Sequence, residues 1–462
     1  MVSQHRPLSL HGGDSTGPSK ILIHAINYAP ELIGCGKYTS ELARFLQQRG
    51  HTVEVVTAPP HYPGWVIQRP YRAYKYMTET IDKIAVTRCP MVMKKNGGGA
   101  WRLLAPLTFA ILAAPMVIWR ALRFHPDVIM CVEPTLVSAP AVLLAAKLSR
   151  SKSVLHVQDL EVDAAFGIGH LRGAWFKQAI MAVERRLLLR FNKIITISAN
   201  MRTALISKGL DSEKIEVVRN WVDLDTIKPR LSRSGHGFRD ELGCRDDDFV
   251  VLYAGHIGPK QALNVVLDAA CRLVDQKKLI FVIVGDGPMK NSLQKTYADL
   301  TNVIYLPLQD ECRLNDLLSI ADLHVLPQMK GAADLVMPSK LGGMLASGRP
   351  IVITAEPGSE LANVLEDIAL IVPAGDSAAL FDAILRARVE DLSLRVERGL
   401  ELAELLSSRV LLPSFETHLL GRGAERQATH QWKGISQQDT TVGKDKSQTK
   451  SAAQARQHPD PF

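Results

Sequence analysis

The chain has 462 residues, and a single hydrophobic core seldom extends beyond about 300, so the length favours two or three domains. Hydrophobic residues make up 46% and charged residues 22%, which excludes a mostly disordered or collagen-like chain. The formal net charge of +8 favours an anionic partner: nucleic acid, a phosphate-bearing small molecule or an acidic membrane surface.

The cysteines and the amino-terminal residues indicate the compartment. The six cysteines show no C-x-x-C pair and no zinc-finger spacing with histidine, so we expect free thiols in a reducing compartment. The first twenty residues lack the apolar stretch of a secretory signal, and the cytoplasm is therefore the expected location. The uncharged segment Leu103–Trp119 leaves three interpretations open. We favour a buried or interface-lying helix over a transmembrane span or monotopic attachment.

Strand and helix patterns alternate from Lys20 onward, which is typical of parallel sheets covered by helices on both faces. In the first half we predict a helix at Tyr38–Arg49, a helix N-cap at Ser198, and strands at Ile21–Ile26, Thr52–Thr57, Val128–Val132, Val154–Val157, Ile194–Ile197 and Ile215–Val218. The pattern weakens over Asp223–Asp248 and then restarts. The predicted strands of the second half are Phe249–Ala254, Leu279–Val284, Val303–Leu306, Leu323–Leu326, Ile351–Thr354 and Ala369–Val372. Its predicted helices are Ala262–Val274, Met289–Leu300, Leu314–Ile320, Ser339–Ala346 and Ala378–Arg388.

These elements predict an α/β fold of two doubly wound domains, residues 20–222 and 223–406. Residues 407–423 would form one more helix. The first nineteen residues and residues 424–462 are polar and have little to bury, so both are predicted to be disordered tails.

Open parallel sheets bind ligands beyond the carboxyl ends of their strands, so the loops that follow strands hold the candidate site residues. Gly34 and Gly36 stand just before a predicted helix, whose free amides suit an anion, although a plain glycine turn explains them equally well. Their spacing fits neither a Walker loop nor G-x-G-x-x-G. His156 and Asp159 lie at a strand end, where acid–base groups are expected and a solvated loop is the alternative.

Three strand-end loops of the second half carry glycine or basic residues. Their candidate residues are His256, Gly258, Lys260, Gly285, Gly287, Asp334, Ser339 and Lys340. Each loop alone is a weak signal, but three of them facing Gly34 and Gly36 across a cleft would form a nucleotide-diphosphate site. An H-E-x-x-H motif is absent. Lys and Arg are scattered without aromatic residues between them, so nucleic-acid binding is not supported.

As an ordered set, these motifs resemble the bacterial glycosyltransferase family 4 enzymes. NYAPELIGCGKYTSELARFLQQRGHTVEVVTA is similar to the family's opening, and VVRNWVDLDTIKP to its inter-domain signature. YAGHIGPKQAL and PSKLGGMLASGRPIVIT resemble the exopolysaccharide branch, which includes colanic acid glycosyltransferases. The resemblance covers about residues 20–420.

The resemblance implies a GT-B fold, in which two Rossmann-like domains face each other across a cleft and the last helix crosses back. It implies a retaining glycosyltransferase that needs no metal or other cofactor and uses a nucleotide sugar as its donor substrate. The C-terminal domain would hold the donor, and the N-terminal domain an oligosaccharide or polyprenyl-linked acceptor at the cytoplasmic face of a membrane. Two alternatives stay open: a non-catalytic GT-B protein of a polysaccharide assembly complex, and a sugar-nucleotide epimerase.

The resemblance also assigns roles to residues. Asp159 and Lys260 are predicted to be catalytic, with Lys260 neutralising the diphosphate. The predicted substrate-binding residues are Gly34, Gly36, His156, His256, Gly258, Gly285, Gly287, Asp334, Ser339 and Lys340. The chain also departs from the family pattern. Leu335 and Gly343 replace two usual glutamates, His256 a usual arginine, and Gln261 the usual lysine after Lys260.

Overall fold

The computed structural model describes residues 17–31, 34–62, 64–93, 99–133, 136–160, 174–230, 237–331 and 337–422. At residues 99–103 and 174–177 it describes the backbone alone. The predicted disordered segments therefore lie largely outside the described residues, as do Asp334 and Leu335.

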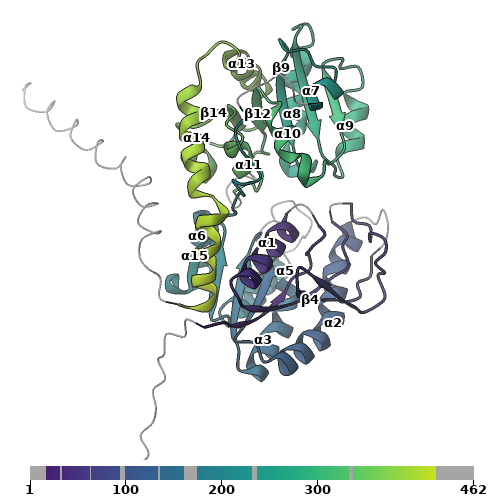
Figure 1. The fold of residues 1–462 in the computed structure, drawn as a ribbon, viewed down its shortest axis with the longest axis vertical. Helices are drawn as coiled ribbons and strands as arrows, with labels where there is room; N and C mark the ends of the chain where they lie inside the picture. Colours follow the sequence, from purple (N-terminus) through teal and green to yellow (C-terminus); the bar gives the residue numbers. More distant parts are fainter. Residues whose placement is uncertain are drawn as a thin grey trace, which may run out of the picture. The chain divides into compact units, whose positions relative to one another are not determined.

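The first half of the chain builds an eight-stranded sheet in the order β3-β4-β2-β1-β5-β6-β7-β8 (Figure 1). All neighbouring strands are parallel except β3 and β4, which pair antiparallel at one edge. The strands are β1 Lys20–His24, β2 Thr52–Thr57, β3 Met77–Ile81, β4 Ile84–Arg88, β5 Val128–Glu133, β6 Lys152–Val157, β7 Lys193–Thr196 and β8 Ile215–Val217. The helices are α1 Cys35–Gln48, α2 Gly99–Phe124, η1 Leu136–Ser138, α3 Ala139–Ser149, α5 Ala174–Leu188, α6 Ala199–Ser207 and η2 Ser212–Lys214.

The second half builds a six-stranded, all-parallel sheet in the order β11-β10-β9-β12-β13-β14. Its strands are β9 Phe249–Ala254, β10 Leu279–Val284, β11 Val303–Leu306, β12 Leu323–Leu326, β13 Ile351–Thr354 and β14 Leu370–Val372. The helices are α7 Gly237–Glu241, η3 Pro259–Gln261, α8 Leu263–Arg272, α9 Lys290–Thr296, η4 Glu311–Arg313, α10 Leu314–Ser319, α11 Leu341–Ala346, α12 Glu360–Val364, α13 Ser377–Ala387, α14 Ser393–Leu405 and α15 Ser408–Leu420. The prediction of two α/β domains with parallel sheets is confirmed.

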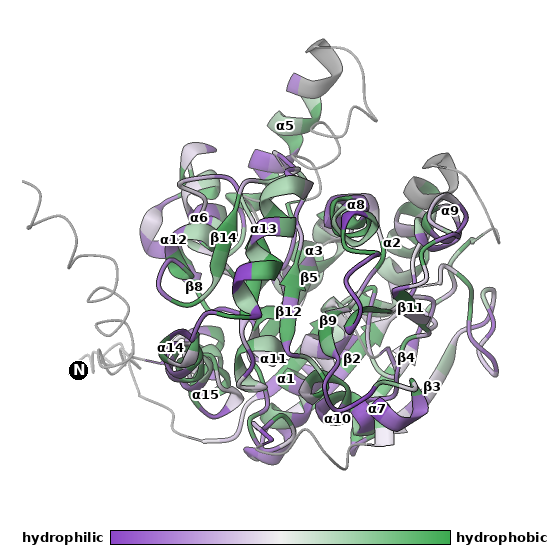
Figure 2. Cartoon of the chain, turned by 90° about the horizontal axis from the view of Figure 1, so that it is seen from above, coloured by the Kyte–Doolittle hydropathy of each residue, from purple (hydrophilic) through white to green (hydrophobic). Residues whose placement is uncertain are grey.

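The central strands are apolar runs because helices cover both faces of each sheet. Every residue of β5 is buried, and Figure 2 shows hydrophobic colour on β5, β9 and β12. The helix that follows β7 begins where its sequence predicts, because the Ser198 side chain accepts a hydrogen bond from the Met201 amide.

The linker between the two sheets pairs with the carboxyl-terminal helices. The Val222 amide donates to Leu406 O at 2.9 Å, and the Ser408 amide donates to Val222 O at 2.8 Å. In Figure 1, α14 runs beside the second sheet's helices and α15 beside the first sheet. Glu416 of α15 lies 2.8 Å from His51 Nε2 in the first half. The chain therefore returns to its first sheet after completing its second.

Helix α2 contains the uncharged segment that left three interpretations open. Residues Leu104–Phe124 are long and apolar enough to cross a membrane by length and composition. One side of the helix nevertheless belongs to the core of the first half, through Ala105, Phe109, Ala113, Val117 and Ala121. The Phe109 ring stacks on His24 of β1 with centroids 5.3 Å apart. This packing supports the favoured interpretation, a buried or interface-lying helix of the domain.

Candidate active site

Three contacts join the first half of the chain to the second at the predicted site. Lys260 Nζ, which follows β9, lies 3.5 Å from Asp159 Oδ2, which follows β6. The rings of Tyr62 and His256 stack with centroids 5.9 Å apart. The Tyr38 hydroxyl donates to Ser339 O at 3.0 Å. The two residues predicted to be catalytic therefore form an ion pair between the strand ends of the two sheets.

Lys340 offers a cation without an anionic partner. Its stem is partly exposed, but its Nζ is shielded from solvent and donates no hydrogen bond to any of the described residues. The Nζ lies over the Tyr253 ring, 4.0 Å from the centroid, and close to the backbone of Gly255. Burial lowers the pKa of Lys340 to about 7. A buried, unpaired ammonium at a strand end is a site where an anion would be bound favourably.

The glycines after β9 and β10 permit close backbone packing. A Cβ at Gly285, where φ is +142°, would collide with Gly255 O. A Cβ at Gly287, where φ is +156°, would collide with Ile257 O. These two positions thus accept only glycine without a shift of the backbone. Their role in a nucleotide pocket stays a prediction, but their packing shapes the loop that carries His256 and Lys260.

Gln261 stands where relatives carry a second lysine, and it makes a cap here. Its Oε1 accepts a hydrogen bond from the Gly258 amide at 3.1 Å. A Cβ at Gly258 would lie 2.8 Å from His256 Nε2, so the loop is tightly folded on itself. Gln261 therefore holds the Lys260 turn in shape and adds no positive charge.

The glycines before α1 occupy two different environments. Gly34 is the N-cap residue of α1, with φ at +65°, and its Cβ position lies 3.5 Å from the Tyr62 ring. The helix begins at Cys35, so the prediction that both glycines precede the helix is wrong for Gly36. Gly36 lies in the first helical turn, where a Cβ would come within 2.9 Å of Glu31 Oε2. The close approach of the Glu31 carboxylate explains why residue 36 is a glycine, since a larger side chain would collide with it.

Sequence reasoning missed Glu31 and Tyr62. Glu31 is buried, and its Oε1 accepts hydrogen bonds from the His61 and Tyr62 amides at 2.8 and 2.9 Å. Its Oε2 accepts a hydrogen bond from Asn27 Nδ2 at 2.8 Å. Glu31 thereby fixes the turn that presents Tyr62 to His256. Burial, with the nearby negative groups, raises the pKa of Tyr62 to about 12, so its hydroxyl stays protonated.

His156 is not brought to the site. It lies inside β6, is buried, and packs edge-on against Phe415 of α15 with ring centroids 4.8 Å apart. Burial lowers the pKa of His156 to about 3, so the imidazole is neutral. Its predicted role in substrate binding stays a prediction, and in the structure its ring packs against α15. Asp334 lies outside the described residues.

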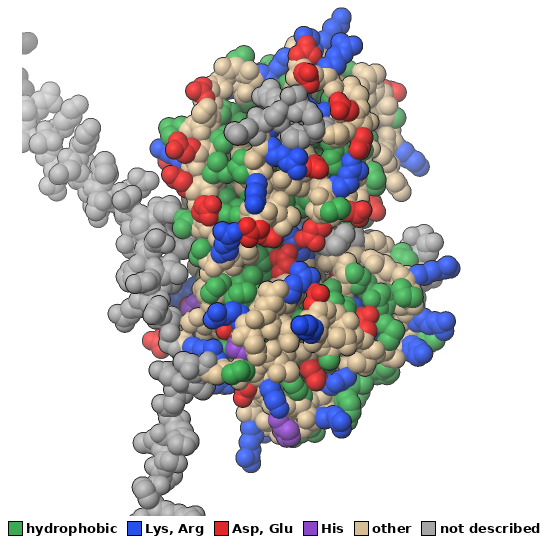
Figure 3. Space-filling model, viewed as in Figure 1, with side chains coloured by type: hydrophobic (Ala, Val, Ile, Leu, Met, Phe, Trp, Pro, Cys, Tyr) green, Lys and Arg blue, Asp and Glu red, His purple; other side chains and the backbone are tan. Residues whose placement is uncertain are grey.

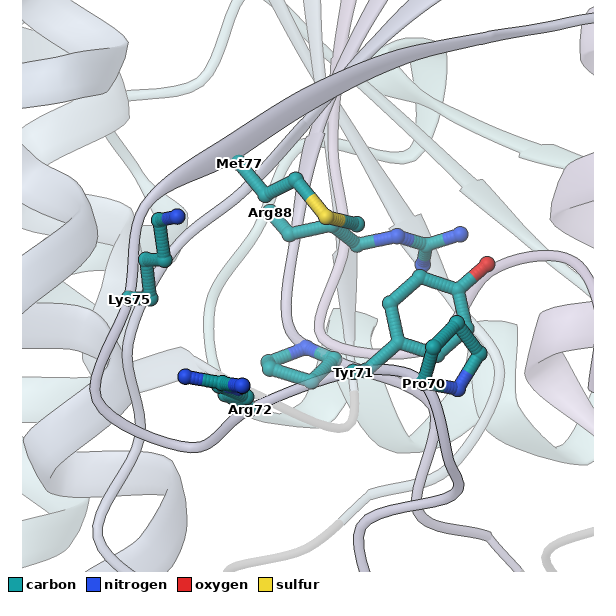
Figure 4. A pocket seen from close by; sticks show the side chains of 7 residues that line it. Pro70, Tyr71, Arg72, Lys75, Met77 and Arg88 are labelled. Carbon is teal, nitrogen blue, oxygen red and sulfur yellow. The ribbon is translucent and has the colours of Figure 1, made fainter.

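Two further features bear on ligands. A cavity of about 200 Å³ in the first half is lined by Arg72, Lys75, Arg88 and Tyr71, among others, and Figure 4 shows the Arg88 guanidinium beside the Tyr71 ring. None of the predicted site residues lines this cavity.

Within the described ranges, no group of three or more His, Cys, Asp and Glu side chains is arranged to hold a metal ion.

Two parallel-sheet domains joined by loops at their strand ends define the GT-B class of glycosyltransferases. The glycosyl transferase 4-like domain matches residues 34–221, and glycosyl transferases group 1 matches residues 248–388. The chain belongs to this glycosyltransferase family. It is 40% identical over 353 residues to the protein of Escherichia coli (strain K12) assigned to colanic acid biosynthesis as the glycosyl transferase WcaI. That match covers 75% of this chain and 86% of WcaI.

Solved structures share the fold. Sucrose-phosphate synthase from Thermosynechococcus elongatus has a TM-score of 0.67 at 15% identity, covering 86% of this chain and 98% of that one. HepE from Anabaena, solved in complex with UDP and glucose, has a TM-score of 0.64 at 17% identity, covering 87% and 99%. The GT-B prediction is confirmed by these similarities.

Proposed function

We propose that this glycosyltransferase transfers a sugar, with retention of configuration, from a nucleotide sugar to an oligosaccharide acceptor of exopolysaccharide biosynthesis. The acceptor would be polyprenyl-linked and met at the cytoplasmic face of the membrane. Similarity to WcaI supports the pathway, and the UDP complex of HepE supports a nucleotide-sugar donor. The observation that carries the proposal is a pair of lysines near the end of β9: Lys260 in the loop that follows the strand, and Lys340 at the start of α11, whose Nζ lies close to Gly255.

In the proposed reaction, the bond between the anomeric carbon and the diphosphate oxygen breaks. The acceptor hydroxyl forms a new bond on the same face of the sugar, and its proton passes to the departing diphosphate. Negative charge grows on the diphosphate as it leaves, so cations held at that place stabilise the transition state more than the ground state. Lys260 and Lys340 would supply that charge, which is the reason we propose that no metal ion is required.

The ion pair between Lys260 and Asp159 would have to break when a diphosphate binds to Lys260. An incoming diphosphate would compete with Asp159 for the Lys260 ammonium, releasing the carboxylate toward the reacting sugar. The pair is about one-third exposed, so it is screened by solvent and exchanges partners at little cost. Asp159 would then lie beside the positive charge that develops on the sugar ring.

Calorimetry with UDP, GDP, dTDP and their sugar conjugates tests the proposal, in EDTA and in magnesium. We expect selective binding of one base, unchanged by EDTA, and weakened at least tenfold in Lys260→Ala. Lys278→Ala is the matched control, because Lys278 precedes β10 at the opposite strand end and pairs with Asp247. Transfer to an acceptor, rather than conversion of the donor alone, distinguishes the transferase from an epimerase.

One observation favours the second candidate, a non-catalytic GT-B protein. Gly343, which replaces a family glutamate, lies in α11, and its Cβ position is only 3.3 Å from the Leu318 side chain. A glutamate at residue 343 would therefore crowd Leu318 of α10. If the folded protein binds none of the nucleotides, the non-catalytic candidate replaces the transferase.

A further inference from the structure

A basic cavity in the first half takes no part in the contacts of the candidate active site. It is the cavity of about 200 Å³ in Figure 4, and no acidic residue lines it. Its lining combines cationic side chains with apolar and aromatic ones, among them Arg72, Lys75, Arg88, Pro59, Tyr71 and Met77. Such a lining offers apolar contact to a sugar ring and positive charge to an oxyanion.

Arg88 is a buried and fixed part of the cavity wall. Its side chain is 1% exposed, and its Nε donates to Glu79 Oε1 at 2.7 Å. Its Nη1 donates to Ala58 O at 3.2 Å, and its Nη2 donates to Ala29 O. Among the described residues, these hydrogen bonds engage three of the five N–H groups that a guanidinium carries. Arg88 therefore keeps donors for a ligand while two neighbouring backbone segments hold it in place.

The cavity has an excess of positive charge. Glu79 Oε2 accepts a hydrogen bond from the Tyr71 hydroxyl at 3.2 Å, in addition to the ion pair of Glu79 with Arg88. Among the described residues, neither Arg72 nor Lys75 forms an ion pair. Since Glu79 already pairs with Arg88, the two exposed cations are not balanced by a carboxylate. Figure 3 shows Lys and Arg side chains around β4 and α2, where an approaching anion would meet positive charge.

The volume of the cavity limits its occupant. Pockets that hold drug-sized ligands usually enclose about 300–1,000 Å³. At about 200 Å³, this cavity is too small for a nucleotide sugar, but it can hold one sugar unit with a charged substituent. The donor diphosphate already has Lys260 and Lys340 as its proposed partners. The cavity therefore suits a part of the acceptor rather than the donor.

The cavity lies at the same edge of the first sheet as the candidate active site. Arg88 is the last residue of β4 and pairs in register with Thr57, the last residue of the parallel strand β2. Pro59 lines the cavity, and Tyr62, which contacts His256, follows it by three residues. Because three residues span at most about 11 Å, the cavity lies within the length of a short oligosaccharide from this contact.

We propose that this cavity binds a sugar unit of the acceptor that carries an oxyanion, either a carboxylate or a phosphate. The apolar side chains contact the sugar ring, and Arg72, Lys75 and Arg88 bind the oxyanion. The inference deepens the proposed function and rests on it in one respect, the assignment of the bound sugar to the acceptor. The binding of a charged sugar depends on the cavity alone and does not require that the chain bind a nucleotide.

Ligand-observed NMR titration of the full chain tests the inference, with glucuronic acid, glucose 1-phosphate and glucose as probes. We expect one charged probe to bind at least tenfold more tightly than glucose, and the tighter of the two charged probes identifies the oxyanion. The variant Arg72→Gln/Lys75→Gln should weaken that binding at least tenfold, and both side chains are exposed, so the fold should be kept. The matched control is Arg123→Gln/Lys147→Gln, which removes the same two charges from exposed residues that do not line the cavity.

The outcomes separate the cavity from the proposed function. Equal binding of charged and neutral probes, or equal binding by Arg72→Gln/Lys75→Gln and the wild type, overturns the inference. Binding that Lys260→Ala abolishes and the double variant keeps would assign the probe to the donor site and also overturns it. Nucleotide calorimetry on the same samples tests the proposed function separately, since Arg72 and Lys75 take no part in the site contacts. Charged-sugar binding that depends on Arg72 and Lys75, without nucleotide binding, would retain the cavity as a binding site and refute the transferase.

Discussion

Replacing Lys340 with methionine should stabilise the protein and abolish tight donor binding. The buried ammonium has no hydrogen-bond partner among the described residues and contacts the Tyr253 ring. Methionine is close to lysine in length and carries no charge to bury. If the function of Lys340 is to bind a diphosphate, the Lys340→Met variant should be more stable than the wild type without ligand. It should also bind the nucleoside diphosphate more weakly.

The size of the effect follows from the pKa of Lys340. Burial lowers that pKa from 10.5 to about 7, which corresponds to about 5 kcal/mol against the charged form. Between pH 7 and pH 10.5, the unfolded chain binds a proton at this lysine that the native chain does not bind. The free energy of unfolding therefore rises with pH across that window, and the penalty is largest at pH 7 and below. Because local opening hydrates the ammonium and the Tyr253 ring attracts it, we expect Lys340→Met to gain about 2–4 kcal/mol at pH 7.

Two assays measure this prediction. Urea unfolding from pH 7 to 10 should show the rise with pH in the wild type and a shallower rise in Lys340→Met. Calorimetry at pH 8 in Tris and in HEPES should show uptake of close to one proton when the wild type binds the nucleoside diphosphate, because the ligand holds Lys340 charged. Lys278→Met serves as the control. A variant that is less stable than the wild type, yet binds the nucleotide equally well, would refute the reasoning.

Three further predictions concern catalysis, packing and pH. Lys260→Ala should lower kcat/KM by about a hundredfold, as removal of a charge-stabilising donor does in other enzymes. Asp159→Asn should leave donor binding unchanged. A kcat/KM of Lys260→Ala equal to that of the wild type would show that Lys260 has no role in the mechanism. Gly285→Ala should lower the free energy of unfolding, measured by urea titration, by about 2–4 kcal/mol. The new Cβ would collide with the backbone oxygen of Gly255, and φ at this residue is +142°. An unchanged urea midpoint would mean that the loop backbone shifts at no cost in stability. Burial lowers the pKa of both His156 and His324 from 6.5 to about 3, so these two side chains alone bind up to two more protons in the unfolded chain than in the native chain between those values. Stability should then fall by up to about 2.7 kcal/mol per pH unit below pH 6, and a flat urea midpoint from pH 6.5 to 4 would contradict this.

The central strands of both sheets were predictable because they are buried on both faces and therefore apolar throughout. The antiparallel pair β3 and β4 at one edge of the first sheet was not predicted. β3 (Met77–Ile81) alternates between partly buried and exposed residues and contains Thr and Glu, and its pairing with β4 is set by a neighbour rather than by its own composition. Helix α14 (Ser393–Leu405) was missed for a similar reason, because its charged residues outnumber the few that are buried. The local composition of a segment therefore predicts elements that are buried in the core, but it predicts partly exposed elements at the edge of the core poorly.

The sequence predicted which strand-end residues belong to the candidate site. It did not predict which of these residues contact one another. Lys260 and Asp159 were each expected at a strand end, but their meeting depends on how the second sheet faces the first. Tyr62 belongs to no quoted motif, and Glu31 lies in the segment similar to the family's opening without being marked as functional, since both residues acquire their roles only from their neighbours in the fold. The sequence places His156 near a strand end but does not show that its side chain points into the core, where it lies inside β6 and packs against Phe415 of α15.

The burial of the Lys340 ammonium without an acceptor among the described residues has an electrostatic consequence. A carboxylate near a buried lysine keeps the lysine charged and partly neutralised before any ligand arrives. Lys340 lies against the Tyr253 ring and has no acceptor among the described residues. The empty site is then close to neutral at Lys340 and becomes charged as the diphosphate binds. Donor affinity should therefore weaken as pH rises above 7, because the proton that binding requires becomes scarcer. A transferase built in this way recognises its donor chiefly through the diphosphate.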